Sequence, residues 1–426
     1  MPRNRVNQSG KAAKKASRYD RPMEPDESVF HIPTLNAINF AWYDPRSLGW
    51  MGYLLVCVPL AIGASLLHAP PAANFALAAL AIVPLAGVMG RATEQLAERL
   101  GPGIGGLMNA TFGNAAELIL ALFALGRGLD DVVKASLTGS IIGNLLLVLG
   151  ASLLAGGMKF PVQRFNRTAA GVGSTLLALA TIGLIVPAMF HHIAPTDVKD
   201  GHKLSVAVGA ILVVTYILSL VFSLITHRSA LGEMGEAEDA PKDTVHAWST
   251  LRSVLTLLGA TVFVAWMSEI LVDAVEPTKD ALGLTSVFMG VVVVAIVGNA
   301  AEHSTAVLMA LKNQMDLAVG IAFGSALQVA LFVAPVLVFA SHLRAEPMDL
   351  VFSTMEVVAV ILAVLLARMV AEDGESTWLE GAMLLMVYGI LGVAFYYMPE
   401  PKSAARPAAA TSSARLGATP TLAPTP

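Results

Sequence analysis

The sequence predicts an all-α polytopic membrane protein with about eleven transmembrane helices: one extra N-terminal helix plus two inverted five-helix repeats. Three observations lead to this prediction. The composition is too apolar and too poor in charge for a soluble protein of this length. Eleven apolar segments are long enough to cross a bilayer. A five-residue peptide also recurs 185 residues further along the chain, with other matches at the same offset.

The composition favours lipid as the solvent of most of the surface. Hydrophobic residues make up 55% of the 426 residues and charged residues only 14%, whereas soluble domains carry about 25% charged residues. A soluble chain of this length would need a charged shell that these residues cannot provide. The net charge of -4 gives no indication of a nucleic-acid partner, and the single cysteine, Cys57, excludes internal disulfides and cysteine-rich metal sites.

The apolar segments set the predicted organisation, since each crossing takes about 20 residues. We expect a disordered basic cytoplasmic tail (1–47), an extra first helix (48–72), repeat one (73–226), an acidic cytoplasmic loop (227–249), repeat two (250–398) and a disordered tail (399–426). The eleven spans are expected at 48–68, 73–92, 104–126, 133–156, 169–190, 204–226, 251–274, 284–311, 317–340, 348–370 and 377–398.

The distribution of basic residues predicts the orientation. Most Lys and Arg residues fall in the tail and in alternate loops that share its side, so the N-terminus is expected to be cytoplasmic. No signal or transit peptide is recognisable at the N-terminus. We therefore expect a multi-pass protein of the plasma membrane, specifically the inner membrane of a bacterium.

The internal repeat has a geometric consequence. The peptide GNAAE occurs at 113–117 and again at 298–302, and the same offset relates Asp131 to Asp316 and Gly139-Ser140 to Gly324-Ser325. Five spans per repeat is an odd number, so the two repeats must cross the membrane in opposite directions. Inverted repeats with a binding site near the midplane are a common plan of secondary transporters.

Each repeat places an acid well inside a predicted span at the repeated peptide, Glu117 and Glu302. A charged group near the bilayer centre costs at least about 2.5–3.5 kcal/mol on insertion scales, so such acids are usually functional. Arg127 and Lys312 lie near helix ends and are expected to reach outward instead. Two acids sharing a site can both bind protons or both ionise around a divalent cation. The pattern therefore predicts competition between protons and a cation; the alternative is a pair of buried, protonated structural acids.

Neutral oxygen donors accompany the two acids. An asparagine precedes each glutamate by three residues, a glycine that eases local unwinding precedes each asparagine, and serine and amide side chains follow on the next span. Asparagine, serine and glutamine also serve simply as hydrogen-bonding contacts between membrane helices. The predicted metal ligands are Glu117 and Glu302, and the full predicted cation-binding set is Glu117, Glu302, Asn114, Asn299, Gly113, Gly298, Ser140, Ser325, Asn144 and Gln328.

A second set of acids is a candidate for a proton path or for gating. Glu94 and Glu269 lie in similar contexts, and Glu98 and Asp273 follow each of them by four residues. The alternative is that they are helix-end acids facing water. His303 directly follows Glu302 and is a candidate for proton handling, or else a packed, hydrogen-bonded histidine.

These motifs resemble those of the calcium/proton exchanger (CAX) family of the cation/calcium exchanger superfamily. The first family motif is similar to TFGNAAELI at 111–119 and GSIIGNL at 139–145, and the second to GNAAEH at 298–303 and GSALQ at 324–328; DGESTWLEG at 373–381 is similar to the loop into the last helix. The resemblance implies eleven helices with the first outside the repeats. It also implies Ca²⁺ as transported substrate, bound between the repeats at Glu117 and Glu302, and alternating access driven by protons without ATP or a cofactor.

Other functions stay open at this point. Exchange of Na⁺ or K⁺ for protons would suit the same fold, with one acid ionised and one protonated. A passive channel is a further option. An enzyme is not expected, because the chain has no His-Glu-x-x-His, Gly-x-Ser-x-Gly or P-loop motif. The sequence does not decide between Ca²⁺, Mn²⁺, Na⁺ and K⁺, and it gives neither stoichiometry, direction nor oligomeric state.

Overall fold

The computed structural model describes residues 45–193, 198–227 and 248–399. All described residues belong to one compact unit. The predicted tails, 1–47 and 399–426, and the predicted loop, 227–249, lie almost wholly outside the described residues.

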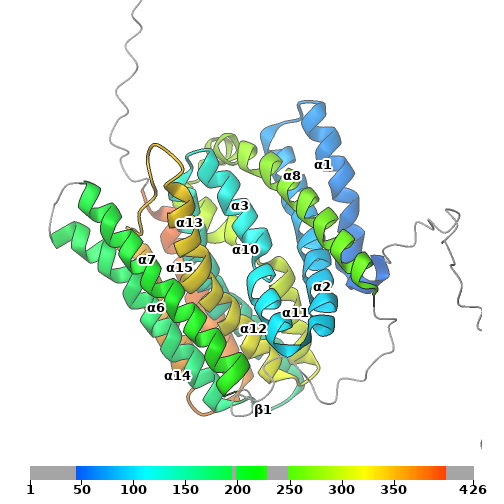
Figure 1. The fold of residues 1–426 in the computed structure, drawn as a ribbon, viewed down its shortest axis with the longest axis vertical. Helices are drawn as coiled ribbons and strands as arrows, with labels where there is room; N and C mark the ends of the chain where they lie inside the picture. Colours follow the sequence, from blue (N-terminus) through cyan, green and yellow to red (C-terminus); the bar gives the residue numbers. More distant parts are fainter. Residues whose placement is uncertain (1–44, 194–197, 228–247, 400–426) are drawn as a thin grey trace, which may run out of the picture. The chain divides into compact units, whose positions relative to one another are not determined.

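The described residues are almost all helical, as predicted (Figure 1). Two short strands, β1 (Gln163–Arg164) and β2 (Glu375–Ser376), pair antiparallel, with Gln163 opposite Ser376. The helices are η2 (Pro45–Val56), α1 (Cys57–Leu66), α2 (Pro71–Phe112), α3 (Ala115–Gly126), α4 (Asp130–Ile142), η3 (Gly143–Val148), α5 (Leu149–Lys159), α6 (Arg167–Ile193), α7 (Val198–Val221), η4 (Phe222–Thr226), α8 (Thr250–Leu282), α9 (Ser286–Phe288), η5 (Met289–Val294), α10 (Ala295–Gly298), α11 (Ala300–Leu311), α12 (Met315–Gln328), η6 (Val329–Val333), α13 (Ala334–Ser341), α14 (Thr354–Val370) and α15 (Trp378–Tyr397).

Long apolar helices make this a multi-pass membrane protein. Among the described residues, seven helices are long and apolar enough to cross a membrane, and an eighth span forms if the bent pair Ser286–Gly298 and Ala300–Leu311 is one crossing. Two further apolar helices, Met51–Leu66 and Ala115–Gly126, are shorter. Each of the eleven predicted spans coincides with helical structure, but the count of eleven crossings stays a prediction.

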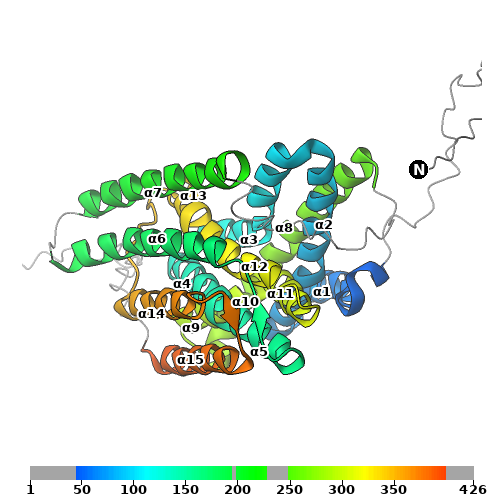
Figure 2. The ribbon, with the colours of Figure 1, turned by 90° about the horizontal axis from the view of Figure 1, so that it is seen from below.

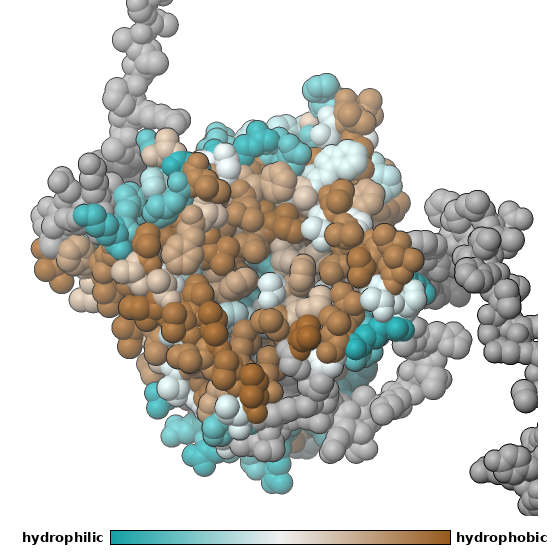
Figure 3. Space-filling model, viewed as in Figure 1, coloured by the Kyte–Doolittle hydropathy of each residue, from teal (hydrophilic) through white to brown (hydrophobic). Residues whose placement is uncertain are grey.

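The surface agrees with a lipid environment. Figure 3 shows hydrophobic residues across the middle of one face of the molecule, with hydrophilic residues towards its upper and lower ends. The peripheral helices α7 and α15 expose large apolar side chains, among them Leu218 and Met386. Figure 2 shows α7 and α15 on opposite sides of α4 and α12, whose spans are mostly buried.

Glycines allow the central helices to approach closely. A side chain at Gly139 of α4 would meet the backbone of Val291 in η5, and one at Gly381 of α15 would meet the backbone of α5. Gly150 and Gly157 of α5 face α15 in the same way. These contacts bring the two repeats into direct backbone proximity at the core.

Four segments adopt π-helical geometry rather than regular α-helix. Two of them, η3 and η6, follow α4 and α12 at nearly the same offset of 185 that relates the repeats. A π-helical turn contains an extra residue and often occurs at functional sites. Here η3 contains Asn144, and η6 starts directly after Gln328, both residues of the predicted cation-binding set.

Two opposite faces can be named from the ends of the helices. The Arg127 face carries the ends of α3, α8 and α13 and the start of α4, and it lies uppermost in Figure 1. The β1 face carries β1 and the ends of α5 and α11, and it lies lowermost.

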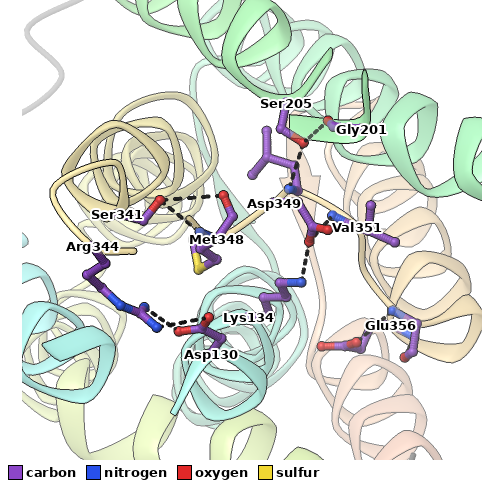
Figure 4. Close-up of polar contacts among 12 residues, drawn as sticks. Asp130, Lys134, Gly201, Ser205, Ser341, Arg344, Met348, Asp349, Val351 and Glu356 are labelled. Carbon is purple, nitrogen blue, oxygen red and sulfur yellow. Dashed lines mark hydrogen bonds and ion pairs between the residues drawn. The ribbon is translucent and has the colours of Figure 1, made fainter. Parts of the chain in front are cut away.

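Ion pairs fix α4 to the segment between α13 and α14 on the Arg127 face (Figure 4). Arg344 donates through Nη1 to Asp130 Oδ1 at 2.6 Å, and Lys134 pairs with Asp349. We refer to these two contacts as the α4 ion pairs. Nearby, the amide of Leu350 donates to Ser205 Oγ at 3.0 Å, which joins the same segment to α7.

Candidate functional site

The predicted residues meet where two helices of opposite repeats are broken. Asn114 has φ -102° and ψ 25°, and Asn299 has φ -97° and ψ 8°, so each interrupts its helix and precedes the next one. Unwinding was expected at the preceding glycines, but Gly113 is helical, with φ -54° and ψ -46°. The break therefore falls on the asparagine in both repeats, and Glu117 and Glu302 lie in the first turns of α3 and α11.

Hydrogen bonds join the polar side chains of both repeats. Asn144 Nδ2 donates to Asn299 Oδ1 at 3.0 Å and to Ser325 Oγ at 2.8 Å. Asn299 Nδ2 donates to Ser140 Oγ at 2.9 Å. These four residues form one network that connects α4 and η3 of repeat one with α11 and α12 of repeat two.

The remaining predicted amides extend this network. Asn114 Nδ2 donates to Gln328 Oε1, and Ser325 Oγ donates to Asn114 Oδ1 at 3.4 Å. Asn114, Asn144 and Asn299 are all buried. Buried amides are stable only when they are hydrogen-bonded, so this network holds the broken helix ends at fixed positions.

The two repeats also meet directly at Glu117. A Cβ added to Gly298 would lie 3.1 Å from Glu117 Cγ, so the glutamate side chain of repeat one passes over the glycine of repeat two. The carboxyl group of Glu302 is close enough to interact electrostatically with that of Glu117. The structure thus brings together Glu117, Glu302 and Gly298, and Gly113 lies beside Gln328.

Three buried oxygen atoms of the site accept no hydrogen bond from the described part of the chain. They are Glu117 Oε1, Glu302 Oε2 and Asn144 Oδ1. Within the described ranges, neither glutamate forms an ion pair with Lys, Arg or His. An unsatisfied buried carboxylate oxygen is costly, so a proton or a cation is needed to balance the pair. The site holds no group of three His, Cys, Asp or Glu side chains among the described residues.

Access to the site differs between the two faces. A cavity of about 480 Å³ is lined by α6, α7, η4 and α12, and it extends from Asn313 and Asp316 near the β1 face to Gln328 in the network. Towards the Arg127 face, Glu117 borders a cavity of only about 20 Å³, which is room for about one water molecule. The walls of this small cavity are mostly apolar and include Leu120, Ala124, Leu271, Val272 and Val275.

The residues predicted for gating or proton transfer lie apart from the network. Glu269 and Asp273 of α8 face Arg127, whose Nη2 lies 3.6 Å from Glu269 Oε1 and 2.9 Å from Asp273 Oδ1. We call these three residues the Arg127 cluster. Glu94 lies in α2 shortly before Gly101, where a φ of 81° breaks the helix, and among the residues that the structure describes His303 forms no side-chain hydrogen bond.

Sequence reasoning missed the partner of Arg127. Arg127 was expected to reach outward to water, and it does lie at a helix end, but it pairs with two acids of the other repeat. No local pattern in the sequence points to this contact, because Arg127 and Asp273 are 146 residues apart in the chain. The π-helical geometry of η3 and η6 likewise carried no sequence signal.

The comparison with protein families matches two stretches of this chain. The model of the family described as sodium/calcium exchanger protein matches residues 71–225 and 252–397. A solved structure of native YfkE is 42% identical, with a TM-score of 0.71, and the match covers 82% of this chain and 100% of that one. An H⁺/Ca²⁺ exchanger CAX structure, 13% identical with a TM-score of 0.63, shares the fold over 83% of this chain and 93% of that one.

The alignments with curated relatives extend over nearly the whole length of each relative. The Ca²⁺/H⁺ antiporter of Aphanothece halophytica is 45% identical over 362 residues, which is 81% of this chain and 96% of the relative. The Ca²⁺/H⁺ antiporter ChaA of Bacillus subtilis (strain 168) is 45% identical over 344 residues, which is 80% of this chain and 97% of the relative. The resemblance seen in the sequence motifs is confirmed, and this chain belongs to the sodium/calcium exchanger protein family, in its calcium/proton exchanger branch.

Proposed function

We propose that this protein is a secondary transporter that exchanges Ca²⁺ for H⁺ by alternating access, and not an enzyme. Its relatives named Ca²⁺/H⁺ antiporter align over almost their entire length. In this proposal Glu117 and Glu302 bind either one Ca²⁺ or protons. Ca²⁺ is substrate, and no cofactor takes part.

The observation that carries this proposal is the pair of neighbouring carboxyl groups, each with one buried oxygen that accepts no hydrogen bond, and with no basic counter-ion in the described structure. Two ionised carboxylates carry two negative charges, which one divalent cation neutralises. Two protons neutralise the same pair, so a site of this kind alternates between two electrically balanced states. A fixed lysine or arginine at the pair would remove the need for either ligand.

The oxygen donors around the pair suit Ca²⁺ in number and type. Ca²⁺ takes about 6–8 oxygen ligands in flexible geometry. In our proposal the carboxylates supply most of the charge, and Asn144 Oδ1 supplies a neutral oxygen. Asn114, Asn299, Ser140, Ser325 and Gln328 keep these ligands in place through the network or donate further oxygens, and carbonyls freed at the two helix breaks, beside Gly113 and Gly298, complete the shell.

The described conformation supports access from one face. The cavity of about 480 Å³ reaches Gln328 from the β1 face, whereas apolar side chains fill the route from Glu117 to the Arg127 face. We propose that transport alternates between this state and one in which the faces exchange roles. The repeats at 73–226 and 250–398 are the moving halves of this scheme, and the segment 48–72 stays outside them.

We further propose that the β1 face and the N-terminus are cytoplasmic, in the inner membrane of a bacterium. The distribution of Lys and Arg supports this orientation. Labelling of single cysteines in intact cells with an impermeant maleimide tests it: Arg164→Cys should be protected, and Leu343→Cys on the Arg127 face should react. The reverse labelling would overturn the orientation.

The central experiment measures Ca²⁺ uptake into proteoliposomes under an imposed pH gradient. The parent should accumulate Ca²⁺, and Glu117→Gln and Glu302→Gln should each abolish uptake because an amide can neither ionise nor bind a proton. Glu276→Gln, an exposed glutamate of α8, is the matched control and should transport like the parent. Uptake of Na⁺ or K⁺ instead of Ca²⁺ would overturn the choice of ion while leaving the two glutamates in place.

The pH dependence of binding provides a second test. Ca²⁺ must displace the protons of both carboxyl groups, so its affinity should increase as pH rises from 6 to 8. The sign follows from competition, because a lower proton concentration leaves more of the ionised pair. Calorimetric titration of the detergent-solubilised protein measures this, and an affinity independent of pH in that range would contradict proton exchange at the site.

A further inference from the structure

The inverted repeat gives Arg127 a structural counterpart in Lys312. Arg127 ends α3 with φ -87° and ψ -1°, and Lys312 ends α11 with φ -93° and ψ 7°. The next residue has positive φ in both repeats, 74° at Gly128 and 61° at Asn313. The two basic residues thus occupy the same position at the ends of equivalent helices.

The backbone hydrogen bonds at these two helix ends match one to one. The amide of Leu129 donates to the carbonyl of Ala124 at 3.0 Å, and that of Gln314 donates to Met309 at 2.9 Å. Donors and acceptors are related by the same offset of 185. The equivalence of Arg127 and Lys312 therefore rests on geometry as well as on sequence.

The helix opposite each basic residue carries two acids four residues apart. On α8 these are Glu269 and Asp273, which face Arg127. On α2 they are Glu94 and Glu98, just before the break at Gly101 that ends the span Pro71–Gly101 at the β1 face. Residues four apart lie on one side of a helix, so both pairs present two carboxylates together.

The two faces differ in whether the basic residue forms an ion pair with the acids of the opposite helix. At the Arg127 face the cluster is formed, α3 packs along α8, and the route to Glu117 is filled. At the β1 face α11 makes a smaller contact with α2, and Lys312 is exposed and forms no ion pair with any described acid. A large cavity also opens at that face.

We propose that Arg127 with Glu269 and Asp273, and Lys312 with Glu94 and Glu98, are alternating closing contacts, one for each entrance. In the described state the Arg127 cluster holds one entrance shut. In the opposite state Lys312 pairs with the acids of α2, and the Arg127 cluster separates. This inference rests on alternating access, part of the proposed function, but not on which cation is carried.

Chemical crosslinking tests the proposal. A substitution removes a charge on one face, and a pair of cysteines on the opposite face reports whether that face has closed. In a Cys57→Ala background, the pair Lys312→Cys and Glu98→Cys reports closure at the β1 face, and Arg127→Gln weakens the contact at the other face. Arg127→Gln should increase the rate of crosslinking by a short bismaleimide about twofold to fivefold, the effect expected from one exposed ion pair. Conversely, Lys312→Gln should increase crosslinking between Arg127→Cys and Asp273→Cys.

The matched control is Arg164→Gln, which removes an exposed arginine–glutamate pair, Arg164 with Glu375, that involves none of the helices α2, α3, α8 and α11. It should leave both crosslinking rates unchanged. Crosslinking at either reporter pair should also stop exchange, since each transport cycle needs both states. No crosslinking at the β1 face when the pair at the Arg127 face reacts, or equal effects of Arg164→Gln and Arg127→Gln, would overturn the proposal.

If the cysteine variants fold poorly, swapping the charges of Lys312 and Glu98 provides a second test. Lys312→Glu should slow exchange, and adding Glu98→Lys should restore at least half of the lost rate. Failure of that restoration would count against a pairing between these positions. Crosslinking is measured without Ca²⁺, so a protein that alternates but does not carry Ca²⁺ would refute the proposed function and leave this inference standing.

Discussion

Two groups of ion pairs lie on the Arg127 face, and they differ in how far water reaches them. In the α4 ion pairs, the side chains of Lys134, Asp349, Arg344 and Asp130 are only 17–29% exposed. In the Arg127 cluster, all three side chains are about half exposed. Shielded ion pairs resist screening and are costly to break, whereas exposed ones contribute little to stability.

Because of this difference, we expect the α4 ion pairs to persist throughout the transport cycle and the Arg127 cluster to break during it. The α4 ion pairs sit among further bonds: Thr138 donates to Glu356 at 3.0 Å, and Ser205 receives the amide of Leu350. The Arg127 cluster has no such surroundings among the described residues. We expect α4, α13 and α14 to stay together during transport, while the contact between α3 and α8 opens and closes.

The largest expected effect comes from removing one partner of a shielded pair. Lys134→Ala leaves Asp349 charged and largely shielded from water, so the free energy of unfolding should fall by about 1–3 kcal/mol. Thermal unfolding in detergent measures the loss. The double variant Lys134→Met with Asp349→Leu is the control and should recover most of it, because no lone charge is left; no recovery would mean that packing, not charge, explains the loss.

A smaller effect is expected from the neighbouring hydrogen bond. Ser205→Ala leaves the amide of Leu350 without its acceptor in a buried position, which should cost about 1–2 kcal/mol. Thr215→Ala, at a partly exposed position of the same helix whose hydroxyl donates only within α7, is the matched control. Equal melting temperatures for the two variants would show that this bond does not help to fix the segment before α14.

The smallest effect on stability is expected at the Arg127 cluster. Arg127→Gln should lower the free energy of unfolding by no more than about 1 kcal/mol, although it shifts the balance between conformations. A loss as large as that of Lys134→Ala would remove the distinction between the two groups of ion pairs.

Salt should sharpen the same distinction. The Debye length falls from about 10 Å at 0.1 M to about 3 Å at 1 M ionic strength. High salt should therefore increase the rate of crosslinking between Lys312→Cys and Glu98→Cys, as Arg127→Gln does. It should not increase that rate further in the protein that carries Arg127→Gln. It should leave the cost of Lys134→Ala nearly unchanged, and an equal salt response at both places would contradict the comparison.

The sequence predicted those features of the structure that depend on a pattern within a short stretch of chain. Apolar runs identified the helices, and the repeated GNAAE peptide identified two equivalent positions, because both signals lie within short stretches of chain. The amide and serine residues chosen for the site do meet in one network. Whether they bind the cation stays a prediction.

Contacts between distant stretches could not be predicted in this way. Lys134 and Asp349 are 215 residues apart, and Glu356 accepts a hydrogen bond from Thr138 across 218 residues. Many acids and bases were equally suitable partners by charge alone. Only the packing of α4 against α14 selects among them.

The π-helical turns η3 and η6 make the site sensitive to how many residues each turn contains, more than to which residues they are. Each residue advances a helix by about 100°, so deleting one residue from Gly143–Val148 would convert that turn towards α-helix and rotate α5 relative to α4. Gly150 and Gly157 would then turn away from α15, and bulkier side chains would meet its backbone. Substitutions within these turns can be absorbed one at a time, whereas a single-residue deletion changes which face the whole of α5, about 16 Å of helix, presents to its neighbours.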